Sequence, residues 1–110
     1  MSCRGYRGYI SSNMVERSVP QNVQQLVIRD YCKRNGLEFL LSATEYCFGG
    51  TKILDAIQED GIVFYSLFQL QCLSILHYKE CHFAAENIKA ITTEEIKKIE
   101  GIWLLKKIVS

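Results

Sequence analysis

The residues best suited to chemistry in this 110-residue chain are carboxylates, amides and hydroxyls that follow short apolar segments. They are Ser11, Ser12, Asn13, Thr44, Glu45, Tyr46, Ser66, Gln69, Glu86 and Asn87. Such groups can hydrogen-bond a polar ligand, and Glu45 or Glu86 in a partly dry cleft could serve as a general base. The same residue types also cap helices and satisfy loop backbone, so a structural role stays open beside the functional one.

Alternating strands and helices would bring these side chains together. Apolar and β-branched segments predict strands over 6–11, 37–43, 62–67 and 81–85, the second of them buried on both faces. A parallel sheet covered on both faces follows from this alternation, with ligands expected beyond the carboxyl ends of the strands. We therefore expect a single α/β domain over 1–110, a small three-layer α/β/α fold with a parallel four-stranded sheet. Its strand order would be flavodoxin-like or resolvase-like.

Helix signals separate these strands. Ser18 and Gln21 have capping-box spacing with Pro20 at an early helical position, and Gly36 provides a left-handed stop. Helical spacing predicts that one face of this first helix is buried, made of Val23, Leu26, Val27 and Tyr31.

Two later helices are expected, with an ambiguous segment between them. Ile53, Leu54 and Ile57 would line a short helix, and the connection over 72–80 could be helix or loop. A second capping box, formed by Thr92 and Glu95, begins a helix that buries Ile96, Ile99 and Trp103.

Other motifs are weaker. The glycine pair 49–50 with Thr51 could hold a phosphate at a helix start, but it lacks the spacing of a P-loop. Cys72, His77, Cys81 and His82 lack the close pairs that fix zinc geometry, because Cys81 and His82 would point in opposite directions on a strand. We expect no metal site and no cofactor. A serine nucleophile is disfavoured, since His82 lies at the wrong end of the sheet.

Composition excludes several partners. Thirteen basic against twelve acidic residues give a net charge of +1. The chain therefore has no excess of positive charge that would attract nucleic acid or anionic membranes. The chain has no apolar run near the ~20 residues that span a bilayer and no expected secretory signal. Five scattered cysteines without a Cys-x-x-Cys pair favour reduced thiols in the cytoplasm.

Two family resemblances follow from longer motifs. The segments 8–12 and 67–70, with Gln21 and Gln24, are similar to the catalytic domain of serine recombinases (resolvases). In that family's pattern, Ser11 replaces an arginine, Asn13 replaces the nucleophilic serine, and Phe68-Gln69 replaces Asp-Arg. The resemblance implies the fold, while the missing charged and nucleophilic groups argue against recombination.

The closer resemblance is to the bacterial sporadic carbohydrate cluster proteins. It is carried by the segments 7–12, 20–24, 41–46, 65–70, 82–87 and 102–103. The chain is shorter than that family at the 49–50 and 72–80 connections. Members are encoded in surface-polysaccharide gene clusters and have no defined activity.

This resemblance implies a cytoplasmic accessory protein of surface-carbohydrate biosynthesis. It would bind a polar sugar or nucleotide-sugar through Ser11, Ser12, Asn13, Ser66, Gln69 and Asn87, with Glu45 or Glu86 as general base if a reaction occurs. The alternative is a non-catalytic homo-oligomeric scaffold, suggested by Phe68, Leu73, Ile75 and Tyr78 near the short third connection.

Overall fold

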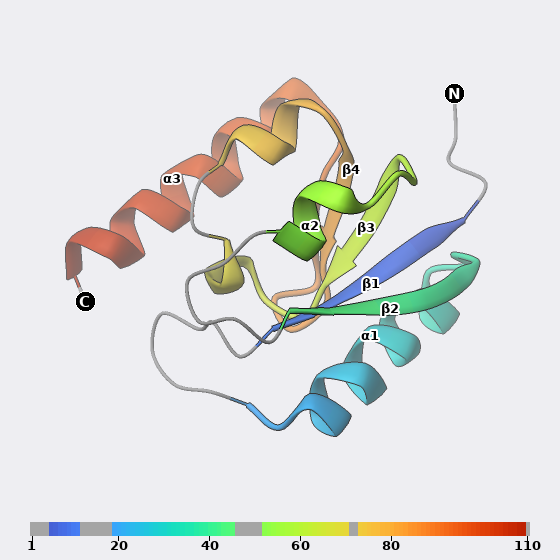
Figure 1. Ribbon diagram of the computed structural model, residues 1–110. Coiled ribbons are helices and arrows are strands. Elements are labelled where there is room, and N and C mark those ends of the chain that lie inside the picture. Colours follow the sequence, from blue (N-terminus) through green and yellow to red (C-terminus); the bar gives the residue numbers. More distant parts are fainter. Residues whose placement is uncertain (1–4, 12–18, 46–51, 71–72, 110) are drawn as a thin grey trace.

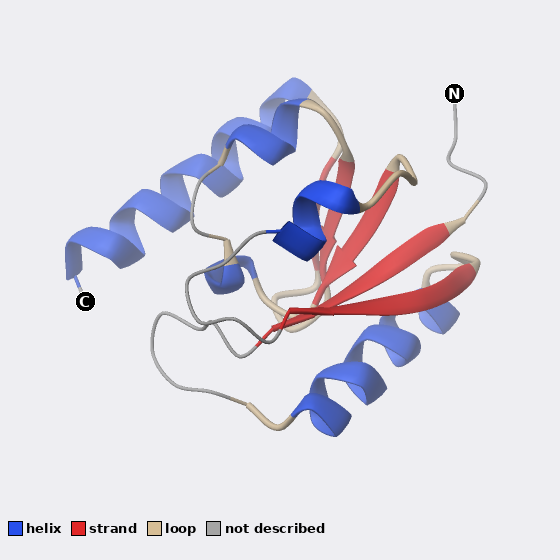
Figure 2. Cartoon of the chain, viewed as in Figure 1, coloured by secondary structure: helices blue, strands red, loops and turns tan. Residues whose placement is uncertain are grey.

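The sheet is the central feature of the computed structural model, which describes residues 5–11, 19–45, 52–70 and 73–109. Its strands are β1 (Tyr6–Ser11), β2 (Phe39–Glu45), β3 (Gly61–Phe64), β4 (Glu80–Phe83) and β5 (Ile88–Ala90), in the order β2-β1-β3-β4-β5. The first four pair in parallel, and β5 pairs antiparallel with β4 (Figures 1 and 2).

Helices cover both faces of this sheet. The helix α1 (Gln21–Arg34) lies on one face, and α2 (Lys52–Ala56) and α3 (Thr93–Val109) lie on the other (Figure 1). Two apolar clusters result, one under α1 that includes Tyr6, Ile28 and Val63, and one under α3 that includes Phe64 and Trp103. Each fully buried large side chain contributes about 1.5–3 kcal/mol to folding, so these clusters hold the layers together.

One buried thiol lies in each cluster. Cys32 is in the cluster under α1, and Cys81 is in the cluster on the opposite face. Both are free cysteines. Burial raises the pKa of Cys32 to about 11 and that of Cys81 to about 12, so both thiols are inert while the fold is closed.

The structure corrects the predicted buried face of α1. Val23 and Leu26 are 39% and 66% exposed, whereas Gln24 and Ile28 are fully buried. The helix begins at Gln21 after Pro20 and has no side-chain cap at its start, while Ser18 lies outside the described residues. The apolar pattern failed to predict this face because Gln24 occupies it. The hydrogen bonds of Gln24 offset the free-energy cost of burying its polar side chain.

The second predicted strand is displaced and only partly buried. It begins at Phe39, and Leu40 and Leu41 are 38% and 67% exposed, because β2 lies at the edge of the sheet. Burial on both faces was therefore wrong for this strand. On the neighbouring strand, a Cβ at Gly8 would lie 2.7 Å from the Ser42 Oγ, so glycine permits the close approach of β1 and β2.

The predicted four-stranded parallel sheet is correct only in part, because β5 was missed. It has three residues and reverses direction after Asn87, whose φ of 55° lies in the left-handed region. Such a short strand has too few residues to show an alternating pattern. The third and fourth strands begin and end within a few residues of their predicted bounds, at Gly61–Phe64 and Glu80–Phe83.

The connection between β3 and β4 forms two short 3₁₀ turns, Leu67–Gln69 and Ser74–His77. Phe68, Leu73 and Ile75 pack against the cluster under α3. Only Tyr78 of the predicted exposed apolar group is strongly exposed, at 78%. The described part of this segment therefore covers the sheet, and of the four apolar residues that suggested a homo-oligomeric scaffold only Tyr78 remains available to a partner.

The predicted start of the last helix is confirmed. The Glu95 amide donates to the Thr92 Oγ1 at 3.2 Å, and the Thr92 amide donates to the Glu95 Oε1 at 3.0 Å. Ile99 and Trp103 are buried, and the Trp103 indole N–H donates to the Leu70 carbonyl. This bond ties the far half of α3 to the end of the first 3₁₀ turn.

Gly36 is confirmed as the stop after α1, with a φ of 67°. The second helix is shorter than its apolar pattern suggests: Leu54 and Ile57 are buried, but Ile53 is 39% exposed. The chain leaves this helix after Ala56 and enters β3 at Gly61.

Candidate functional site

The carboxyl ends of β1 and β3 meet through two glutamine side chains. The Gln24 amide group accepts from the Ser11 backbone N–H at 3.2 Å and donates to the Ser11 and Val19 carbonyls at 2.9 and 2.7 Å. The Gln69 Nε2 donates to the Gln24 Oε1 at 2.8 Å. A buried glutamine of α1 thus bonds both backbone groups of Ser11 and links them to the turn after β3.

A second set of hydrogen bonds continues from Gln69 to Glu86. The Ser66 amide donates to the Gln69 Oε1 at 3.2 Å, and the Ser66 hydroxyl donates to the Glu86 Oε2 at 2.7 Å. The Leu67 amide donates to the Glu86 Oε1 at 2.9 Å. Glu86 therefore holds the first 3₁₀ turn from the end of β4, while Ser66 and Gln69 form its capping box.

Glu45, at the end of β2, joins the same edge through Tyr9. The Tyr9 hydroxyl donates to the Glu45 Oε1 at 2.7 Å, and the Ile53 and Leu54 amides donate to the same carboxylate at 3.0 and 3.3 Å. Burial, reinforced by the Glu45 hydrogen bond and charge, raises the pKa of Tyr9 far above its ordinary value. A side-chain hydrogen bond between Ser11 and Tyr9 opposes this rise.

These contacts form two sets of hydrogen bonds at one edge of the sheet, one around Glu45 and one from Ser11 to Glu86, which we call together the carboxyl-edge network. Its members are Tyr9, Ser11, Gln24, Glu45, Ser66, Gln69 and Glu86. Six of them are at most 4% exposed, and Glu86 alone is half-buried. Within the described residues, no buried polar side-chain atom lacks a hydrogen-bond partner. Glu86 is therefore the member that a ligand can reach without displacing another.

The other predicted site residues lie apart from this network or cannot be placed. Asn87 is exposed in the turn between β4 and β5, and Thr44 is half-buried near the end of β2. Ser12, Asn13, Tyr46 and the 49–51 motif lie outside the described residues. Gln24, which holds the network together, was part of the motifs but was not among the predicted site residues.

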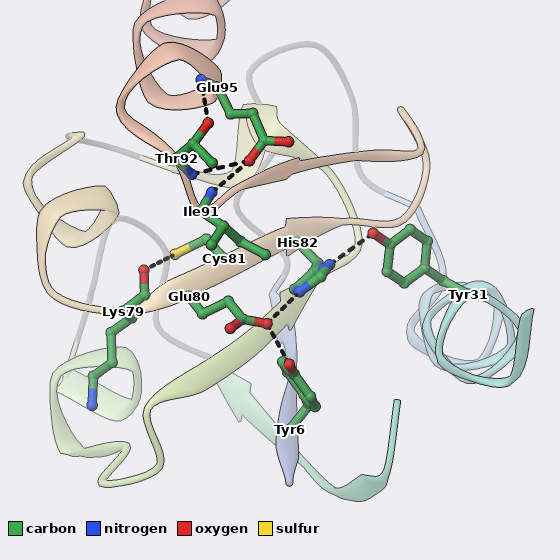
Figure 3. Close-up of polar contacts among 9 residues, drawn as sticks. All are labelled: Tyr6, Tyr31, Lys79, Glu80, Cys81, His82, Ile91, Thr92 and Glu95. Atoms are coloured by element: carbon green, nitrogen blue, oxygen red, sulfur yellow. Dashed lines mark hydrogen bonds and ion pairs between the residues drawn. The ribbon is translucent and has the colours of Figure 1, made fainter. Parts of the chain in front are cut away.

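A second polar cluster was not predicted from the sequence. The Tyr31 hydroxyl lies 2.8 Å from the His82 Nδ1, and the His82 Nε2 lies 2.9 Å from the Glu80 Oε2 (Figure 3). The Tyr6 hydroxyl donates to the same carboxylate oxygen. We call Tyr31, His82 and Glu80 the histidine relay. Its sequence signal is the i, i+2 spacing of Glu80 and His82, which places both on one face of β4.

The order of protons in this relay follows from hydrogen-bonding chemistry. An ionised Glu80 can only accept, so the His82 Nε2 donates to it, and in the neutral form of the ring this is the nitrogen that carries the proton. Its Nδ1 then accepts the Tyr31 proton. Burial raises the pKa of Tyr31, which keeps the phenol protonated until a base accepts its proton.

The described residues contain no candidate metal site and no candidate membrane-spanning helix. Cys81 packs under α3 while His82 bonds with α1, which confirms that the two side chains point in opposite directions. In the part of the chain that the structure describes, no group of three or more His, Cys, Asp or Glu residues could hold a metal ion. Over the same residues, no helix combines the length and the apolar character needed to cross a bilayer.

Comparisons of this chain with family models, with curated proteins and with solved structures found no match. The function is therefore argued from the two polar clusters.

Proposed function

We propose that this chain binds a small polar ligand, a sugar or a nucleotide-sugar, at the carboxyl edge of its sheet. One observation carries the proposal: residues from four separate segments are joined in the carboxyl-edge network, at the end of a sheet where α/β proteins bind ligands. Sugars are recognised by amides, hydroxyls and carboxylates of this kind, and Glu86 is the member of the set that stays partly open to solvent.

In this proposal Glu86 contacts the ligand and the buried members position it. Glu86 receives two hydrogen bonds and stays partly open to solvent. Glu45 is 2% exposed and accepts from three donors, so it holds α2 and Tyr9 in place. If a reaction occurs, Glu86 is the general base, since it can reach a ligand hydroxyl. Ser12 and Asn13, which lie outside the described residues, stay predicted ligand contacts.

The wider role proposed is that of a cytoplasmic accessory protein in surface-carbohydrate biosynthesis. It is supported by the motifs shared with the sporadic carbohydrate cluster proteins and by the free thiols of Cys32 and Cys81. The observed strand order supports the flavodoxin-like or resolvase-like assignment of the four parallel strands.

Calorimetry with UDP-glucose and with free glucose tests the binding site. The wild-type chain should bind at least one of them. Glu86→Ala should weaken that binding about tenfold or more, the size expected for losing a hydrogen bond to a charged group. Glu94→Ala, at an exposed position of α3, is the matched control and should bind as wild type. Equal affinity of Glu86→Ala and wild type would exclude the site.

A homo-oligomeric scaffold is the second candidate. Leu104 and Leu105 of α3 are 51% and 64% exposed, and Leu41 on the edge strand is 67% exposed. Light scattering at high concentration should show a species larger than one chain that Leu105→Glu dissociates. A single-chain mass at every concentration would contradict this candidate.

A further inference from the structure

A groove lies beside the histidine relay, and no member of the carboxyl-edge network lines it. It runs between the end of α1, the strand β5 and the first half of α3, with a cavity volume of about 380 Å³. Six of its lining residues matter here: Tyr31, Asn35, Asn87, Lys89, Glu95 and Lys98. We call it the β5 groove. Tyr31 is thus shared by the relay and the groove, although it is only 3% exposed.

The charges of the β5 groove favour an anionic ligand. Lys89 and Lys98 are exposed and carry two positive charges. The one carboxylate, Glu95, accepts hydrogen bonds from the Ile91 and Thr92 amides, which lower its pKa and occupy it at the start of α3 (Figure 3). The amide groups of Asn35 and Asn87 add neutral hydrogen-bonding capacity. A small molecule with a carboxylate matches this lining.

The relay has the connectivity that activates a hydroxyl nucleophile. A weakly acidic hydroxyl becomes reactive when a histidine accepts its proton during attack and a carboxylate stabilises the resulting imidazolium. Tyr31, His82 and Glu80 provide these three roles in order, with contacts of 2.8 and 2.9 Å. Tyr9 provides a contrast within the same chain, because its hydroxyl donates directly to Glu45 and no histidine intervenes.

We propose that the β5 groove is an acyl-transfer site for small anionic esters, with Tyr31 as the nucleophile. The Tyr31 oxygen bonds to the ester carbonyl carbon, the bond from that carbon to the alcohol oxygen breaks, and the Tyr31 proton passes through His82 to the departing alcohol. Water then attacks the tyrosyl ester and gives one proton to His82. The Tyr31 oxygen leaves the acyl carbon and recovers that proton, so a carboxylic acid and an alcohol are the products.

Two chromogenic esters test this site on the full chain: the 4-nitrophenyl monoester of succinate, which is anionic, and 4-nitrophenyl acetate, which is neutral. The expected result is a burst of 4-nitrophenolate of about one equivalent, with the succinyl group mapped to Tyr31 by mass spectrometry. The anionic ester should react faster. Lys98→Ala should lower that preference about fivefold, the effect of one exposed charge pair.

Variants separate a reactive relay from a merely structural one. Tyr31→Phe should abolish the burst, and Glu80→Gln should slow acylation on the order of 100-fold while circular dichroism remains that of the folded wild type. Tyr78→Phe, which removes the hydroxyl of an exposed tyrosine outside both polar clusters, is the matched control and should keep the burst. Mapping the acyl group in the wild type needs no variant. Absence of acyl-Tyr31 there, or an unchanged burst in Tyr31→Phe, would overturn the proposal.

Discussion

The carboxyl-edge network and the histidine relay are both buried and both end in a carboxylate, but they differ in what they bond. Gln24, Glu45 and Glu86 bond backbone groups of neighbouring segments. In the relay, Tyr31, His82 and Glu80 bond one another's side chains. The first arrangement fixes the path of the chain, whereas the second joins three titratable side chains directly.

This difference separates stability from reactivity. Removing a network side chain leaves buried backbone donors and acceptors unpaired, and each such group costs about 1–3 kcal/mol. Removing a relay hydroxyl leaves one ring nitrogen without its partner and spares the backbone. Substitutions in the network should therefore mainly lower the free energy of unfolding, and substitutions in the relay should mainly change chemistry.

The largest effect is expected at Gln24. Gln24→Ala removes the partners of the Ser11 backbone, the Val19 carbonyl and the Gln69 amide at once. We expect the free energy of unfolding to fall by about 3 kcal/mol. Urea denaturation measures this, with Gln21→Ala at an exposed position as control. A loss no larger than that of the control would show that the network does not hold the chain.

Glu45→Gln should have the second-largest effect. The substitution removes the charge and replaces one of the two oxygens by an N–H₂ group, which must then face either the Ile53 amide or the Leu54 amide, both of which are donors themselves. We expect a loss of about 2 kcal/mol in urea denaturation. Tyr9→Phe removes only one of the three donors to this carboxylate and should cost less. The reverse ranking would mean that Tyr9, and not the start of α2, anchors Glu45.

A smaller loss of stability is expected in the relay. Tyr31→Phe preserves the ring that packs in the cluster under α1 and removes one hydroxyl. The free energy of unfolding should fall by about 1 kcal/mol. If the loss reaches that of Gln24→Ala, the contrast between the two clusters fails.

The smallest effect is expected on the pH dependence of stability, through Glu95 at the start of α3. The hydrogen bonds from Thr92 and Ile91 lower the pKa of Glu95 below its ordinary value of 4.5 in the folded chain. Its stabilising contribution is therefore present above pH 4.5 and is lost as the pH falls through the lower folded value. Thermal unfolding from pH 7 to pH 3 should show a shallower acid decline in Glu95→Gln than in wild type. Parallel curves would contradict this assignment.

The sequence predicted those elements whose signals are local. The strand Tyr6–Ser11 and the capping box of Thr92 and Glu95 were correct, because β-branched residues and cap spacing act over a few positions. The predicted buried face of α1 was correct for Tyr31 but wrong for Val23 and Leu26, because a glutamine occupies an inner position that an apolar pattern cannot recognise. The strand β5 was too short to detect.

The candidate site shows the same limit. Residues that follow parallel strands are expected to gather at one edge of the sheet, and this predicted that Ser66, Gln69 and Glu86 lie together. Their hydrogen bonds confirm it. The expectation did not show that most of these groups would bond one another. The contact of Tyr31 with His82 joins positions 51 residues apart, and only the packing of α1 on the sheet creates it.

Among the described residues, the buried thiols of Cys32 and Cys81 can report on the opening of the fold. Cys32 is shielded by α1 and Cys81 by the opposite layer, so alkylation of each thiol requires a different side of the sandwich to open. Matching alkylation rates at the two positions describe a fold that opens all at once. Faster labelling of Cys32 means that α1 detaches while the rest of the sheet stays covered.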